Sequence, residues 1–130
     1  MLESIIYAVI IYEDFNRPKI ARWIENLKFK VTKKPLTLGV MQVRSDRLLS
    51  DFESVQLGTE KIVEAYKKYI EKLVEKNESF SECAAIHSII QDYNTGSSYN
   101  SEVSELADII KNTFYKDKEY SLNLELKNDI

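Results

Sequence analysis

The sequence contains few of the residues that interrupt helices or that build covalent and metal sites. Its 130 residues include three glycines, two prolines, one cysteine and one histidine. A single cysteine excludes an internal disulfide, and one cysteine with one histidine excludes a zinc site of the usual composition. No apolar run approaches the ~20 residues that a membrane-spanning helix needs. A glycine-rich loop for a phosphate is also missing, so we expect neither a metal nor a cofactor.

The rest of the composition is that of one globular domain. The hydrophobic content is 44% and the charged content is 30%, and a chain of this length has room for one modest core. We therefore expect a single domain over residues 1–130. Cys83 and His87 lie among small or apolar residues, which predicts a buried structural thiol and a core or boundary histidine rather than catalytic groups.

Apolar spacing predicts a mainly α fold in the first half of the chain. The dense apolar run at residues 3–13 predicts a helix buried on most sides. Residues 18–29 predict a second helix with one apolar stripe, and this stripe includes Trp23, which we expect in the core. Short extended segments are expected around residues 36–43 and, near the end of the chain, at residues 121–127.

Capping signals predict three further helices, which brings the expected total to about five. The residues at 50–53 and at 79–82 both match a capping box, in which serine and glutamate bond each other's backbone N–H groups. They predict a third helix that reaches about residue 75 and a fourth helix after it. Asn100 or Ser101 is expected to cap the last helix.

Positive charge is concentrated in one segment. Residues 17–34 hold seven basic residues and one acid, although the whole chain has a net charge of −3. Two interpretations are open: a patch that faces anionic cell-wall polymer or lipid head groups and so anchors the protein at the cell envelope, or a solvated helix face. The acidic remainder and the absence of a nucleic-acid-binding motif predict no nucleic-acid partner.

Four short motifs lie in a meaningful order. Glu13 ends the first apolar run, and Gly-Val-Met-Gln at residues 39–42, Leu-Gly-Thr at 57–59 and Tyr-Asn-Thr-Gly at 93–96 follow. This order resembles the goose-type lysozyme and soluble lytic transglycosylase superfamily, whose members cleave the glycan strands of bacterial peptidoglycan. The resemblance covers most of the chain and implies a lysozyme-like α fold with peptidoglycan as the partner.

Glu13 is the candidate catalytic residue. A glutamate at the end of a buried apolar helix is desolvated, which favours its neutral form and suits proton donation to a glycosidic oxygen. In lytic transglycosylases, as the resemblance implies, the substrate's own 2-acetamido group attacks the anomeric carbon, so a second carboxylate is not needed. The same glutamate then acts as base on the 6-hydroxyl of N-acetylmuramic acid, which gives a 1,6-anhydro sugar. The competing interpretation is a surface glutamate at a helix end.

The later motifs supply the expected substrate-binding residues. In the family, the glycine lets the backbone approach the sugar, methionine and glutamine line the cleft, and the tyrosine lies near the catalytic glutamate. The Gln42 amide can both donate to and accept from an acetamido group, while Tyr99 either stacks on a sugar or fills the core. The implied set is Gly39, Met41, Gln42, Tyr93, Asn94 and Tyr99.

Two departures from the family pattern keep other functions open. Asp14 stands where serine commonly follows the catalytic glutamate, and the basic second helix lengthens the distance from Glu13 to Gly39. The alternatives are a hydrolytic lysozyme on the same fold and a non-catalytic domain that binds or regulates at peptidoglycan.

The resemblance also predicts where the protein acts. Peptidoglycan lies outside the cytoplasm, which implies the cell envelope, the periplasm or the extracellular space, or the cytoplasm before release. The apolar run at residues 5–11 follows Glu3 and no basic region, so it does not predict a signal peptide. We expect an export signal or anchor to be absent from this chain.

Overall fold

The computed structural model describes residues 1–16 and 19–115. It is mainly helical, which confirms the predicted fold class, while the extended segment expected at residues 121–127 lies outside the described residues. The described elements are α1 (Leu2–Asn16), α2 (Lys19–Thr32), β1 (Leu36–Leu38), β2 (Val43–Ser45), α3 (Asp51–Lys76), α4 (Glu82–Tyr93), α5 (Ser97–Ile110) and the π-helical turn η1 (Lys111–Tyr115).

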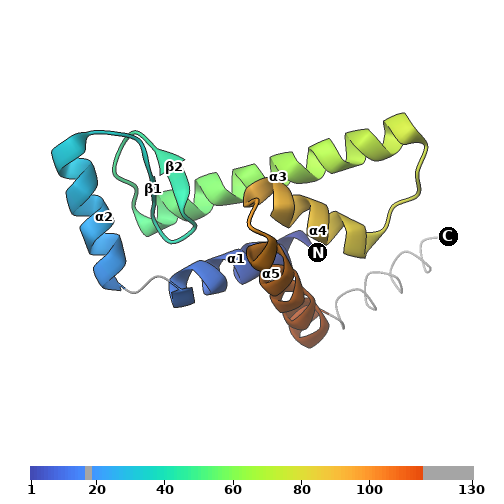
Figure 1. Ribbon diagram of the computed structural model, residues 1–130. Coiled ribbons are helices and arrows are strands. Elements are labelled where there is room, and N and C mark those ends of the chain that lie inside the picture. Colours follow the sequence, from blue (N-terminus) through green and yellow to red (C-terminus); the bar gives the residue numbers. More distant parts are fainter. Residues whose placement is uncertain (17–18, 116–130) are drawn as a thin grey trace, which may run out of the picture.

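Four helices enclose the core. The long helix α3 crosses the molecule, α4 returns along it, and α1 and α5 cross beneath (Figure 1). Apolar side chains from all four helices meet between them and exclude water. The fully or nearly fully buried members include Ile5, Val9, Ile62, Ile86, Ile89, Ile90, Val103 and Ala107.

The segment expected to be extended forms a hairpin. Strands β1 and β2 pair antiparallel with Leu36 opposite Ser45 and Leu38 opposite Val43, and residues 39–42 make the turn between them. The hairpin packs on α3 on one side and on α2 on the other. The Gly-Val-Met-Gln motif therefore forms a tight turn, which the sequence-based expectation of an extended segment did not include.

One of the two predicted capping boxes is present. The Ser50 side chain accepts from the Glu53 N–H and the Glu53 side chain accepts from the Ser50 N–H, so α3 starts where the sequence predicts. The box predicted at residues 79–82 is wrong, because the N-cap of α4 is Ser81, whose side chain accepts from the Ala84 N–H. A serine two residues further along therefore caps the helix, and the helix starts two residues later.

The predicted start of the last helix is also wrong. Helix α5 begins at Ser97 with Gly96 as its N-cap and no side-chain cap. Asn100 lies inside the first turn, where its side chain contacts the Nδ1 of His87 at 2.9 Å and donates to the His87 carbonyl at 3.0 Å. His87 is exposed and joins α4 to α5 through these bonds, so it does not lie in the core.

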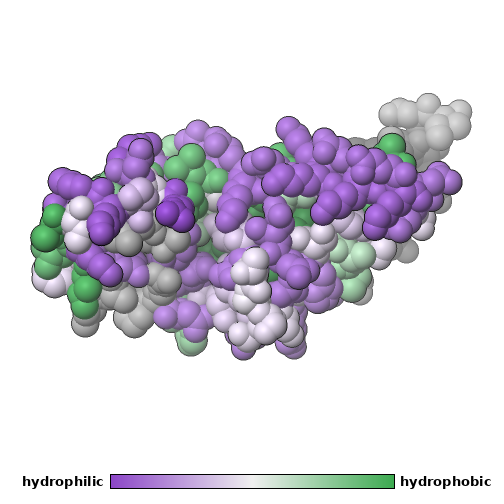
Figure 2. All heavy atoms as spheres, turned by 45° about the horizontal axis from the view of Figure 1, so that its top comes forward, coloured by the Kyte–Doolittle hydropathy of each residue, from purple (hydrophilic) through white to green (hydrophobic). Residues whose placement is uncertain are grey.

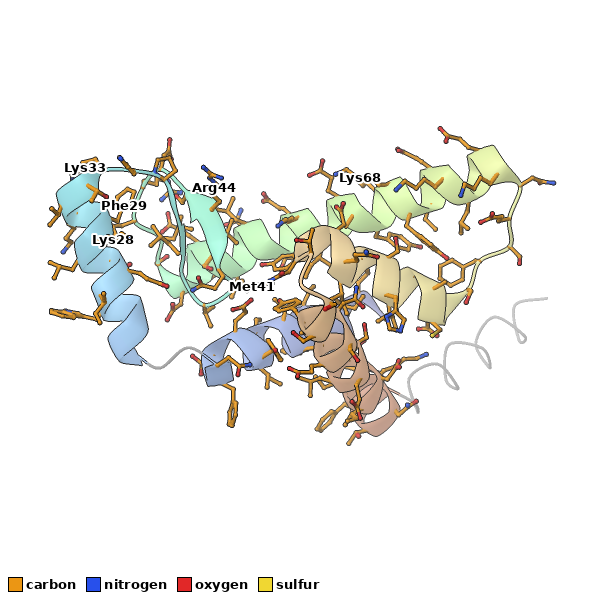
Figure 3. The ribbon with its side chains drawn as sticks, in the orientation of Figure 1. Lys28, Phe29, Lys33, Met41, Arg44 and Lys68 are labelled. Atoms are coloured by element: carbon orange, nitrogen blue, oxygen red, sulfur yellow. The ribbon has the colours of Figure 1, made fainter. Side chains whose placement is uncertain are left out.

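Helix α2 differs most from expectation. Trp23 is 65% exposed, and Ile24 and Leu27 are about half exposed, so the predicted core position of this stripe is wrong. Instead, Phe29 is buried on the side of α2 that faces the hairpin (Figure 3). The prediction of a buried Cys83 is wrong too, because the thiol is exposed. Within the described part of the chain, each helix is too short or too polar to cross a membrane.

Candidate functional site

A cavity of about 510 Å³ opens where the C-terminal end of α1 meets the hairpin turn and the α4–α5 loop. Its walls come from segments far apart in the sequence, so only the folded chain assembles them. The lining residues are Tyr12, Glu13, Asn16, Gln42, Arg44, Lys61, Tyr93, Asn94, Thr95 and Tyr99. The expected convergence of Glu13, Gln42 and Tyr93 on one cavity is therefore present.

Glu13 reaches the cavity because it continues the buried stripe of α1. Ile5, Val9 and Glu13 are spaced by four residues and lie on one helix face. Only 8% of Glu13 is exposed, and it is the one carboxylate among the described residues that line the cavity. A buried carboxyl group aimed at a cavity is the arrangement that proton transfer requires.

Two buried tyrosines stand next to this carboxyl group. Burial raises the pKa of the Tyr93 hydroxyl above its ordinary value, and the negative charge of Glu13 raises it further. The pKa of Tyr99 is raised in the same way, first by burial and then by Glu13. Both hydroxyls therefore keep their protons at any physiological pH, which leaves them able to donate hydrogen bonds in the surroundings of Glu13.

Tyr12 extends this aromatic group to the rim of the cavity. Its ring meets the ring of Tyr99 edge to face, with 5.0 Å between the centroids. Its hydroxyl donates to Glu102 Oε2 at 2.5 Å, and this hydrogen bond is the main cause that raises the Tyr12 pKa. Tyr99 thus belongs to the core, which is one of the two roles that the sequence left open, and it also lines the cavity.

Tyr93 fixes the hairpin turn over the cavity. Its hydroxyl donates to the Met41 carbonyl at 2.5 Å, which joins the end of α4 to the turn. Gln42 has a left-handed backbone with φ of 52°, and its Nε2 donates to the Gly39 carbonyl at 2.9 Å. These bonds direct the Gln42 side chain to the cavity wall, where its Oε1 is buried without a hydrogen-bond partner in the described structure.

Ser54, at the start of α3, supports the turn from below. Its Oγ accepts from the Met41 N–H at 3.0 Å and lies 3.4 Å from the Leu38 carbonyl. Gly39 has φ of 75°, and a Cβ there would lie 2.3 Å from the Ser54 Cβ. The sequence singled out Gly39 but not Ser54, because a buried serine inside a helix carries no distinctive spacing.

Two of the expected binding residues do not line the cavity. The Met41 side chain is fully buried and fills the space that Gly58 leaves, since a Cβ on Gly58 would lie 2.6 Å from the Met41 Sδ. Gly39 serves the turn and its contact with Ser54, rather than a sugar. The glycine of α3 therefore accommodates the side chain of a turn residue.

Asn94 lies at the cavity and also shapes the loop after α4. It is the C-cap of α4, and its Oδ1 accepts from the Gly96 N–H at 3.0 Å. This bond holds the short α4–α5 connection, and with it Thr95, at the edge of the cavity. Asn94 therefore both lines the cavity and shapes this loop.

Sequence reasoning missed two cations at the cavity. Lys61 of α3 donates to the Tyr93 carbonyl at 2.8 Å, and its Nζ lies 4.4 Å from the centroid of the Tyr93 ring. Arg44 projects from β2 (Figure 3) and also lines the cavity. Lys61 follows Gly58 by three residues and Arg44 follows Gln42 by two. This closeness to the motifs is the signal that could have found them, but spacing alone did not identify them as site residues. Among the described lining residues, the cavity thus combines one carboxylate with two positive charges.

Comparison with family models, curated proteins and solved structures finds no match to this chain. Over residues 1–16 and 19–115 there is also no group of three or more histidine, cysteine, aspartate or glutamate side chains placed to hold a metal ion.

Proposed function

We propose that this protein is a peptidoglycan lytic transglycosylase with a lysozyme-like fold, and that Glu13 is its catalytic acid and base. The observation that carries the proposal is the burial of Glu13 in a cavity with Tyr93, Tyr99 and Gln42. A carboxyl group that is buried beside a cavity loses hydration, so its placement here supports a role in proton transfer.

Glu13 performs both proton transfers in this mechanism. Its carboxyl group gives a proton to the glycosidic oxygen as the bond to the anomeric carbon breaks. The substrate's acetamido oxygen attacks that carbon, and the 6-hydroxyl of N-acetylmuramic acid then displaces it. The Glu13 carboxylate takes the 6-hydroxyl proton, which restores the starting state and leaves a 1,6-anhydro sugar.

Substrate assistance agrees with the groups in the cavity. A double-displacement glycosidase places two carboxyl groups about 5 Å apart, and an inverting one places them further apart. Glu13 is the one carboxylate among the described lining residues, so the attacking group is best supplied by the substrate. Gln42 also lines the cavity, and its amide would accept from the acetamido N–H once the side chain turns toward the substrate, which orients this group for attack.

Tyrosines and cations hold the substrate around Glu13. The protonated hydroxyl of Tyr99 is buried and would donate to the Glu13 carboxylate, and the partly exposed ring of Tyr12 offers an aromatic surface to a sugar. Lys61 and Arg44 would attract the carboxylates of the peptide stems on the glycan. These features support a peptidoglycan strand as substrate and, with it, action at the cell envelope or outside the cell.

Digestion of purified sacculi tests the proposal. A lytic transglycosylase releases anhydro-muropeptides, which are lighter by one water than the reducing-end muropeptides that a hydrolytic lysozyme releases. Mass spectrometry of the products separates the two enzymes. Release of reducing-end muropeptides alone would show that the protein is a hydrolytic lysozyme and not a transglycosylase. Binding to sacculi without any release would instead support a non-catalytic peptidoglycan-binding domain.

A further inference from the structure

Helix α2 presents an apolar stripe to solvent. Trp23, Leu27, Val31 and Ile24 are all roughly half to three-quarters exposed, and at 100° per residue they fall within an arc of about 100° on the helix surface. Phe29 lies roughly opposite this arc, and its burial attaches α2 to the hairpin. Hydrophobic atoms accordingly appear at the end of the molecule where α2 lies (Figure 2).

Lysines border the stripe on both sides. Lys30 lies next to Trp23 around the helix and Lys28 lies beyond Ile24, again at 100° per residue. Lys33 and Lys34 follow at the end of the helix, and all four lysines are exposed. Glu25, the one acid in α2, falls outside the arc. An apolar stripe with tryptophan at its edge and lysines along its flanks is the pattern of a helix that lies in a membrane interface.

We propose that α2 docks the protein on the surface of an anionic phospholipid bilayer, with the stripe among the acyl chains and the four lysines at the head groups. A soluble polyanion would engage the lysines and leave the stripe in water, so it explains only half of the surface. A second copy packed stripe to stripe would bring Lys28 and Lys30 of both copies together, which like-charge repulsion opposes. A negatively charged bilayer covers the apolar stripe with acyl chains and offers anionic head groups to the lysines.

Membrane attachment through α2 is independent of the chemistry at Glu13, but it would place the cavity close to the bilayer. Helix α2 packs on β1, and β1 is joined to the turn that carries Gln42. Substrate strands that lie next to the membrane would therefore be the ones within reach of the cavity.

Vesicle binding tests this surface with a built-in probe, because Trp23 is the single tryptophan of the chain. The full chain is titrated with vesicles of phosphatidylglycerol and phosphatidylcholine in equal parts, and with vesicles of phosphatidylcholine alone. Binding to the anionic vesicles with a blue shift of Trp23 emission is the expected result, together with at least tenfold weaker binding to the neutral ones. An unshifted emission, an absence of binding or equal binding to both vesicles would overturn the proposal.

Variants separate the stripe from general surface effects. The pair Lys28→Gln and Lys30→Gln is expected to weaken binding about 25-fold, since each lysine near an anionic surface contributes about fivefold. Val31→Ser is expected to weaken it about fivefold. Val74→Ser is the matched control, because Val74 and Val31 are both 76% exposed, and it should bind like the parent chain. Equal binding by Val31→Ser and Val74→Ser, or self-association through α2 in place of vesicle binding, would overturn the proposal.

Discussion

Helices α1 and α2 are neighbours in the sequence and both carry an apolar face, yet these faces end in different surroundings. The face of α1 is covered by α3 and α5, and it continues into the cavity through Glu13. The face of α2 meets solvent, and one opposite side chain, Phe29, attaches the helix to the hairpin. Apolar spacing therefore identifies the face of a helix, whereas the tertiary contacts decide what covers it.

The end of α1 should matter for chemistry far more than for stability. Glu13→Gln keeps the shape of the side chain but cannot transfer a proton, so release of muropeptides from sacculi should fall by about 10²–10⁴. Its thermal midpoint should stay close to that of the parent chain. The matched control is Asp14→Asn, which makes the same change at the exposed neighbour and should retain activity. Full activity of Glu13→Gln would remove Glu13 from the mechanism.

The turn beside α1 should tolerate substitution poorly. Gly39→Ala is expected to destabilise the protein by roughly 3 kcal/mol, because alanine disfavours a positive φ and its Cβ meets the rigid Cβ of Ser54. Urea unfolding followed by circular dichroism measures this. Gly96→Ala is the control, since φ is −66° there and the nearest atoms to a new Cβ are 3.4 Å away. Similar losses in both variants would show that Gly39 holds no special position.

The two sides of α2 should respond differently to truncation. Phe29→Ala is expected to lower stability by about 2 kcal/mol through the loss of buried contacts. Trp23→Ala should change it by less than about 0.5 kcal/mol, as for other exposed positions. Circular dichroism suits both variants, because Trp23→Ala removes the fluorescent probe. A large loss for Trp23→Ala would mean that the stripe is covered in solution.

The smallest expected effect concerns the start of α3, which supports the turn. Hydrogen bonds from the Ser50 backbone and from Arg47 hold the pKa of Glu53 at about 2, below its ordinary value of 4.5. A lowered pKa stabilises the fold above pH 4.5, and this contribution disappears as the pH falls toward 2. Glu53→Gln should therefore flatten the fall of the melting temperature between these pH values. An unchanged pH profile would show that the capping box contributes little in solution.

Sequence reasoning succeeded where a local signal determines local structure. The Ser50 box placed the start of α3 because its two hydrogen bonds close within four residues. Sequence reasoning failed at residues 79–82, because more than one serine near the start of α4 can serve as the N-cap. It also failed for Trp23 and Cys83, whose burial depends on which elements pack together and not on spacing.

The candidate site was also predicted in part. The order of the motifs predicted that Glu13, Gln42 and Tyr93 would share a cavity. Arg44 and Lys61 were missed, because single cations on a strand and on a long charged helix resemble ordinary surface residues. Met41 was assigned to the cleft, but its side chain is buried against Gly58 beneath the turn.

The hydrogen bond from Tyr93 to the Met41 carbonyl spans 52 residues of sequence, and that from Tyr12 to Glu102 spans 90. Such distant pairs form only after the long intervening segments have closed, and loop closure costs entropy that local helix formation does not. The walls around Glu13 should consequently be among the last parts to assemble as the chain folds. Amide hydrogens of the turn should also exchange with solvent faster than those in the middle of α3, since opening the turn leaves the helix intact.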